Sequence, residues 1–161
     1  MEYYEQETGY TCGNACFRMV LSDQGLPDMT EEQLVKIMET KSESGTHYND
    51  MVKVAEKFGL QCVYGEHGTL KQIDDLTKEG WTVIVAYSVD VPHFAVYVEN
   101  NGNHLFLYDP AFGMDMSYLI SKFDRKWLVD VSMYRKAITE MDLKLDPSLN
   151  TDHWFVAYKK K

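Results

Sequence analysis

The stretch QETGYTCGNACFRMVL, residues 6–21, decides the fold of the N-terminal half of the chain. Its second part spaces apolar residues as an amphipathic helix does, and it predicts a helix over residues 13–24 that ends at Gly25. Cys12 stands where this helix begins. Unpaired N–H groups and the positive end of the helix dipole favour a thiolate there. Cys12 is therefore a candidate nucleophile, and a buried, inert cysteine is the ordinary alternative.

Gln6 is the neighbour that bears most on this choice. A side-chain amide on the loop before the helix can donate an N–H to a developing oxyanion, beside the backbone N–H of Cys12. A solvated surface glutamine is the simpler interpretation. Another interpretation of Cys12 is that it forms half of a zinc site with Cys16. Against this, the chain has no companion CxxC pair, and the five histidines show no ligand spacing. We expect no metal and no cofactor, and we assign Cys16 to the core.

Composition limits the classes of partner. At 161 residues the chain predicts one domain, residues 1–161, with a normal hydrophobic core. A net charge of −9 argues against nucleic acid or anionic lipid as a partner, and three cysteines argue against a disulfide framework. No apolar run reaches the roughly 20 residues of a membrane span, and the acidic N-terminus is unlike a secretory signal. We expect a cytoplasmic protein, and the sequence leaves its oligomeric state open.

Helical patterns dominate up to residue 80, and strand patterns follow. The second half begins with WTVIVAYSV, a β-branched and aromatic run that predicts a strand buried on both faces. Helices first and an antiparallel sheet after them predict an α+β fold. The further helices are expected at residues 31–40, 47–58 (with Thr46 as the cap), 70–79 and 116–123, and the strands at 60–64, 81–89, 93–99, 104–110 and 154–158. Residues 127–134 fit either a strand or a helix, and residues 136–152 show no clear pattern.

Two polar residues lie at the ends of the expected strands. His93 precedes a hydrophobic strand, where a fixed backbone suits a general base that shares a proton with a thiolate. Asp109 ends the next strand, which is joined to the first by the hairpin signal NNGN. A carboxylate on a paired strand can hold the Nδ1–H of His93 and fix its tautomer. Cys12, His93 and Asp109 together form a candidate catalytic group, although each alone is a weak signal.

These motifs resemble a known family. The stretch around Cys12 is similar to the N-terminal signature of the bacteriocin-processing cysteine peptidases, which cleave double-glycine leader peptides and are fused to peptide-exporting ABC transporters. The likeness continues in order through residue 127, and residues 128–153 lie outside it. The other matching motifs are GTHYNDMVKVAEKFGLQC, PHFAVYVE and YDPAFGMDMSYLISKF.

The resemblance implies a papain-like fold with Cys on a helical half and His and Asp on a sheet half. It implies that Cys12 is the nucleophile, His93 the base, Asp109 the orienting acid and Gln6 the oxyanion donor. The substrate would be a peptide or protein, and we expect a stand-alone member without the transporter. Two alternatives use the same residues. One is a transpeptidase or amide-transfer enzyme like the phytochelatin-synthase type, and the other is a non-catalytic peptide-binding module.

Overall fold

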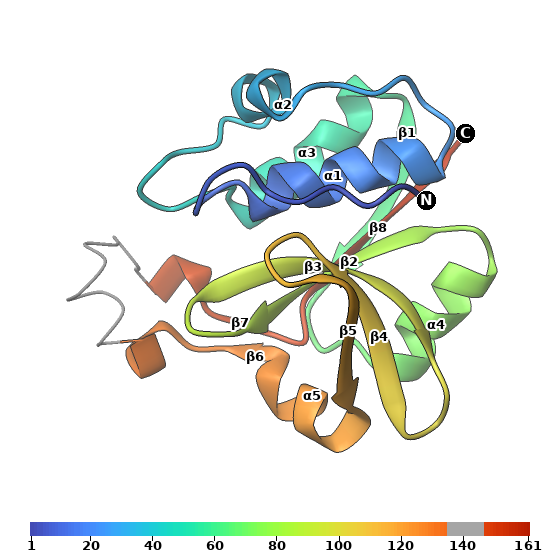
Figure 1. Cartoon of the computed structure of the whole chain (residues 1–161), viewed down its shortest axis with the longest axis vertical. Coiled ribbons are helices and arrows are strands. Elements are labelled where there is room, and N and C mark those ends of the chain that lie inside the picture. Colours follow the sequence, from blue (N-terminus) through green and yellow to red (C-terminus); the bar gives the residue numbers. More distant parts are fainter. Residues whose placement is uncertain (135–146) are drawn as a thin grey trace.

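The chain forms a group of helices packed on a six-stranded antiparallel sheet, which confirms the α+β prediction (Figure 1). The computed structural model describes residues 1–134 and 147–161. Within them, no helix is both long and apolar enough to cross a membrane. The helices are α1 (Cys12–Asp23), α2 (Glu31–Ile37), α3 (Tyr48–Lys57), α4 (Leu70–Lys78) and α5 (Ile120–Lys126), with 3₁₀ turns at Val131–Tyr134 and Pro147–Leu149. The strands are β1 (Leu60–Gly65), β2 (Thr82–Ser88), β3 (Pro92–Asn100), β4 (His104–Asp109), β5 (Gly113–Leu119), β6 (Leu128–Val129), β7 (Thr151–Asp152) and β8 (Phe155–Lys160).

The sheet has the strand order β1-β8-β2-β3-β4-β5, and β6 and β7 form a separate two-stranded sheet. The C-terminal strand β8 pairs with both β1 and β2. It therefore lies inside the sheet, between two strands that precede it in the chain. From β2 to β5 the strands follow one another as neighbours, as hairpin-connected strands do. This order leaves β1 and β5 as the two edge strands.

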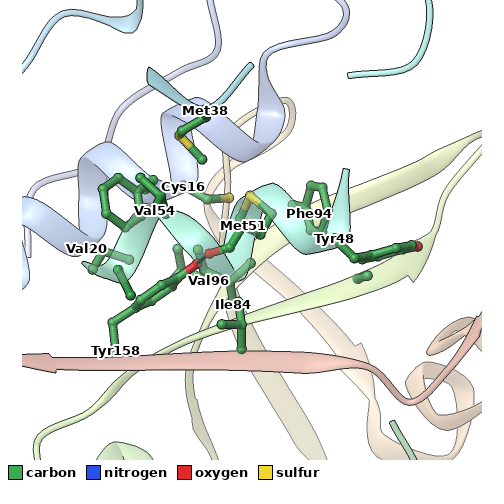
Figure 2. Packing of buried hydrophobic residues seen from close by; sticks show 14 of the residues in the cluster. Cys16, Val20, Met38, Tyr48, Met51, Val54, Ile84, Phe94, Val96 and Tyr158 are labelled. Carbon is green, nitrogen blue, oxygen red and sulfur yellow. Dashed lines mark hydrogen bonds between the residues drawn. The ribbon is translucent and has the colours of Figure 1, made fainter. Parts of the chain in front are cut away.

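The face of the sheet toward α1 and α3 carries the larger core, in which α3 lies across the strands (Figure 2). Cys16 is fully buried in this core, as the sequence predicts. Gly13 lets α1 and α3 approach each other, since a Cβ at this position would lie 3.1 Å from Met51 Sδ and 3.2 Å from the Thr46 side chain. The start of α1 is thus fixed against the segment that leads into α3.

The opposite face of the sheet carries a second core under α4 and α5. Strand β2 contributes to both cores: Ile84 and Ala86 belong to the first, and Val83, Val85 and Tyr87 to the second. Alternate residues of a strand point to opposite faces. The prediction of a strand buried on both faces is therefore confirmed.

Some predicted boundaries were wrong. The third helix is capped by His47, whose Nδ1 accepts from the N–H of Asn49, while Thr46 is bonded to Thr40 instead. Residues 116–123 do not form one helix, because β5 continues to Leu119 in register with β4 before α5 begins. Helix α2 ends at Ile37, shorter than expected. Residues 127–134 form β6 and a 3₁₀ turn, and most of the stretch 136–152 lies outside the described residues.

Candidate active site

Cys12 is the first residue of α1 and is partly exposed. The preceding residue, Thr11, does not cap the helix with its side chain. Its hydroxyl is bonded instead to Thr8, 2.8 Å from the Thr8 hydroxyl and 3.1 Å from the Thr8 backbone nitrogen. The first-turn N–H groups of α1 are therefore left without a side-chain cap, beside the thiol of Cys12.

His93 lies at the start of β3, where its backbone pairs with Tyr87 of β2, and it is only 6% exposed. Its Nε2 lies 2.7 Å from Asp109 Oδ1, and its ring also hydrogen-bonds the side chain of Cys12. Since Asp109 occupies Nε2, the nitrogen left for Cys12 is Nδ1. The sequence-based expectation that Asp109 would hold Nδ1–H was wrong, because the ring is oriented with Nε2 toward Asp109.

Asp109 is completely buried at the end of β4. Its Oδ1 accepts from the backbone N–H groups of Ala111 (2.8 Å) and Phe112 (3.1 Å), in addition to His93. Its Oδ2 accepts from the hydroxyl of Tyr87. Both carboxylate oxygens thus have donors, which is how a buried charge is made tolerable.

The protonation states of His93 and Asp109 follow from these contacts. Burial disfavours the imidazolium form of His93, but the negative charge of Cys12 and the bond to Asp109 outweigh it and raise the pKa of His93 to about 10. Burial also opposes the ionised form of Asp109, yet hydrogen bonds and attraction from His93 keep the pKa of Asp109 below its usual value. The arrangement favours a charged imidazole beside the ionised carboxylate of Asp109 at neutral pH.

Tyr87 is the residue that sequence reasoning missed. It stands near the end of the apolar run of β2 and is fully buried, so the periodicity assigns it only to the core. Burial and the neighbouring charge of Asp109 raise its pKa, so the phenol stays protonated and donates. The one signal available from the sequence is general: a buried tyrosine hydroxyl needs a hydrogen-bond partner.

Gln6 lies beside the turn that follows Asp109, since its backbone N–H donates to the carbonyl of Pro110 at 2.9 Å. Its side-chain Nε2 donates to the carbonyl of Thr8 at 2.7 Å. Its Oε1 is buried and has no hydrogen-bond partner among the described residues. The structure therefore links Cys12 and Asp109 through His93, and it brings the backbone of Gln6 to the turn that follows Asp109.

A cleft opens at Cys12 and His93. Its lining includes the loop of residues 42–46 and the apolar residues Val91, Phe94 and Leu149. Such a mixture of apolar walls and a few polar groups is typical of a ligand site. Among residues 1–134 and 147–161, no group of three or more His, Cys, Asp or Glu side chains is placed to hold a metal ion.

Comparison with known sequences bears on this site. The sequence profile of the peptidase C39 family matches residues 1–137, most of the chain. The chain belongs to the peptidase C39 family. It is accordingly a cysteine peptidase, as the sequence predicts. A search of curated proteins gives no significant match.

Solved structures of peptidase C39 domains share the fold. The peptidase domain of Streptococcus ComA, a bifunctional ABC transporter involved in quorum sensing, superimposes with a TM-score of 0.70 at 15% identity, covering 99% of this chain and 100% of that one. A double-glycine-motif protease from an AMS/PCAT transporter, solved with its leader peptide, gives 0.66 at 20% identity, covering 99% and 91%. A C39-like peptidase from Bacillus anthracis gives 0.70 at 12%, covering 99% and 94%. The papain-like fold is thereby confirmed.

Proposed function

We propose that this C39 peptidase cleaves a peptide bond with Cys12 as nucleophile, His93 as acid and base, and Asp109 as the group that orients His93. The observation that carries the proposal is the contact chain Cys12–His93–Asp109, in which His93 shares one ring nitrogen with each partner. A nucleophile, a base and an orienting group within hydrogen-bond reach are what covalent catalysis requires.

The reaction follows from the placement of these groups. The thiolate of Cys12 attacks the carbonyl carbon, and the C=O π electrons move to the oxygen. Collapse of this intermediate breaks the C–N bond, and the leaving nitrogen takes the proton from Nδ1 of His93. A thioester remains on Cys12. Water then attacks it while His93 takes a proton, which releases the acid and restores the thiolate.

The oxyanion would be held by the backbone N–H of Cys12 and by Gln6. The first turn of α1 has no side-chain cap, so its N–H groups are available to a developing negative charge. An amide nitrogen has two hydrogens, and Thr8 takes one of those on Gln6. We assign the second to the oxyanion. Replacement of such a donor costs about 10²–10³-fold in kcat in other enzymes, and Gln6→Ala should do the same here.

The substrate is a peptide or protein whose acyl part occupies the cleft beside Cys12. The decisive experiment incubates the protein with a panel of peptides, including some with a double-glycine motif, and identifies products by mass spectrometry. Trapping of an acyl-enzyme on Cys12 and loss of cleavage in Cys12→Ala support the proposal. Equal cleavage by Cys12→Ala, or alkylation of Cys62 by iodoacetamide while Cys12 stays unmodified, would contradict it.

The same experiment separates the alternatives. An added amine that appears in the product identifies a transferase, since a hydrolase passes the acyl group to water. Peptide binding that persists in Cys12→Ala without any cleavage in the wild type identifies a binding module.

A further inference from the structure

Phe112 is a large apolar side chain left exposed beside the candidate base. It is 55% exposed, and its ring meets the ring of His93 edge-on with a centroid separation of 5.9 Å. Single exposed apolar residues are common on protein surfaces. This one differs because it touches a group that must exchange protons with the substrate.

The turn that carries Phe112 is held in one conformation. Asp109 pairs with Gly113 across the turn, and the backbone N–H of Phe112 donates to Asp109 Oδ1 at 3.1 Å. Gly113 has a φ of +120°, a conformation that side-chain-bearing residues rarely adopt. An aromatic ring on such a turn loses little conformational freedom when a ligand packs against it.

Phe112 contacts His93 from outside the lining of the cleft. His93 lines the cleft, but Phe112 is not among the described residues that do so, although the two rings are in contact. The turn of Phe112 also carries Pro110, whose carbonyl holds the backbone of Gln6. A peptide with its scissile carbonyl at Cys12 therefore extends into the cleft in one direction and over Phe112 in the other.

The reaction chemistry indicates which part of the peptide lies in the cleft and which part lies over Phe112. The acyl part stays bound as a thioester until water attacks, and the cleft provides walls to hold it. The leaving nitrogen must lie against His93, which protonates it, and Phe112 is the exposed group next to His93. Resting on the proposed function, we propose that Phe112 forms the wall of the subsite for the first residue of the leaving peptide and favours an apolar side chain there.

The test uses two peptides with the same acyl part that differ only in the residue after the scissile bond, leucine in one and aspartate in the other. The acyl sequence is one that the wild type cleaves. We expect the wild type to prefer leucine by about tenfold or more in kcat/KM, since one buried apolar contact gives roughly 10–200-fold discrimination. Phe112→Ala should reduce the ratio to about threefold or less, and Phe112→Leu should retain most of it.

Tyr64→Ala is the matched control, because Tyr64 is an aromatic residue of similar exposure (58%) on the other edge strand, β1. It should leave the ratio unchanged. The rate at which iodoacetamide alkylates Cys12 should also stay unchanged in Phe112→Ala, since this reagent has no leaving peptide.

Three outcomes would overturn the proposal. In the first, Phe112→Ala keeps both the wild-type ratio and the wild-type kcat/KM. In the second, it lowers kcat/KM equally for both peptides and shifts the pH profile, which means that Phe112 only shields the His93–Asp109 pair. In the third, it changes selectivity for the acyl residues instead. If the wild type cleaves no peptide although Cys12 is alkylated, the proposed function fails first, and this subsite fails with it.

Discussion

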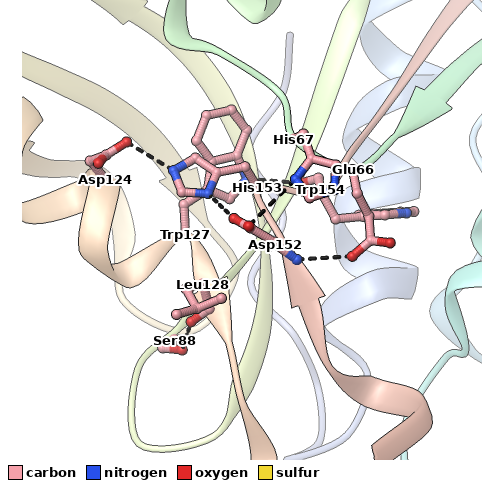
Figure 3. A network of polar contacts seen from close by, with 9 residues as sticks. All are labelled: Glu66, His67, Ser88, Asp124, Trp127, Leu128, Asp152, His153 and Trp154. Atoms are coloured by element: carbon pink, nitrogen blue, oxygen red, sulfur yellow. Dashed lines mark hydrogen bonds and ion pairs between the residues drawn. The ribbon is translucent and has the colours of Figure 1, made fainter.

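Two histidine–carboxylate clusters of similar geometry differ in what they can do. In the candidate active site, His93 lies 2.7 Å from Asp109, and both side chains are buried. In the second cluster, His153 lies 2.5 Å from Asp152 and 2.8 Å from Asp124 (Figure 3). Its ring is 20% exposed, and Asp124 is 70% exposed. Distance alone does not distinguish them.

The difference lies in the second ring nitrogen. Both nitrogens of His153 face carboxylates, Nδ1 that of Asp152 and Nε2 that of Asp124, so neither nitrogen is left to face a substrate. The ring of Trp127 packs against the His153 ring, with a centroid separation of 4.7 Å. His93 gives one nitrogen to Asp109 and keeps the other for Cys12. A histidine held by carboxylates on both sides is suited to joining segments of the fold, whereas one held by a carboxylate on one side and facing a thiol on the other is suited to proton transfer.

The strongest test of this contrast removes each ring. His93→Ala should lower kcat/KM for a cleaved peptide by about 10³-fold or more, because general acid–base catalysis and thiolate formation are lost together. His153→Ala should leave kcat/KM within about twofold. Steady-state kinetics on the same peptide measure both. Equal losses of kcat/KM in the two variants would show that the two clusters do not differ in their role.

Removal of the carboxylate charges is the next test. Asp109→Asn keeps the shape of the side chain but loses the charge that supports the imidazolium, and we expect a loss of about 10²-fold in kcat. Asp124→Asn, which makes the same change beside His153, should have no effect on kcat. A normal kcat in Asp109→Asn would exclude an orienting role for Asp109.

The pH dependence sharpens the comparison further. Burial lowers the pKa of His93, but Cys12 and Asp109 raise it to about 10, so the ring is protonated below that pH and loses the proton above it. The acid that serves the leaving amine is thus present at neutral pH, and kcat/KM should fall above about pH 10. In Asp109→Asn the fall in kcat/KM should begin at a lower pH. In His153→Ala the pH at which kcat/KM falls should be the same as in the wild type. Imidazole NMR shifts of His93 in Cys12→Ala provide an independent check, since loss of the Cys12 charge should lower this pKa.

The smallest expected effect concerns Tyr87. Tyr87→Phe leaves Oδ2 of Asp109 buried without this donor, and we expect a loss of about 1–3 kcal/mol in the free energy of unfolding with a several-fold fall in kcat. Tyr97→Phe is the matched control, because Tyr97 donates to Asp74, whose side chain is 16% exposed and can bond water. Urea unfolding should show a smaller loss for Tyr97→Phe and no change in kcat. Equal losses in the two variants would contradict a special role for the buried pair.

By itself, the sequence determined the kinds of element and the chemistry-bearing residues. Periodicity and caps predicted α1 and the buried strand β2, because these patterns are local. The position of Cys12 at a helix start and of His93 at a strand start is likewise readable from neighbouring residues. The boundary between β5 and α5 was not, because pairing with β4 overrides the local pattern there.

Only the tertiary structure decided which atoms meet. The orientation of the His93 ring gives Nε2, and not Nδ1, to Asp109, and it leaves Nδ1 for Cys12. The hydroxyl of Tyr87 on β2 reaches Asp109 on β4 across the intervening strand β3, a contact that no pattern within β2 encodes. These are contacts between residues far apart in the chain, and they follow from strand order and register.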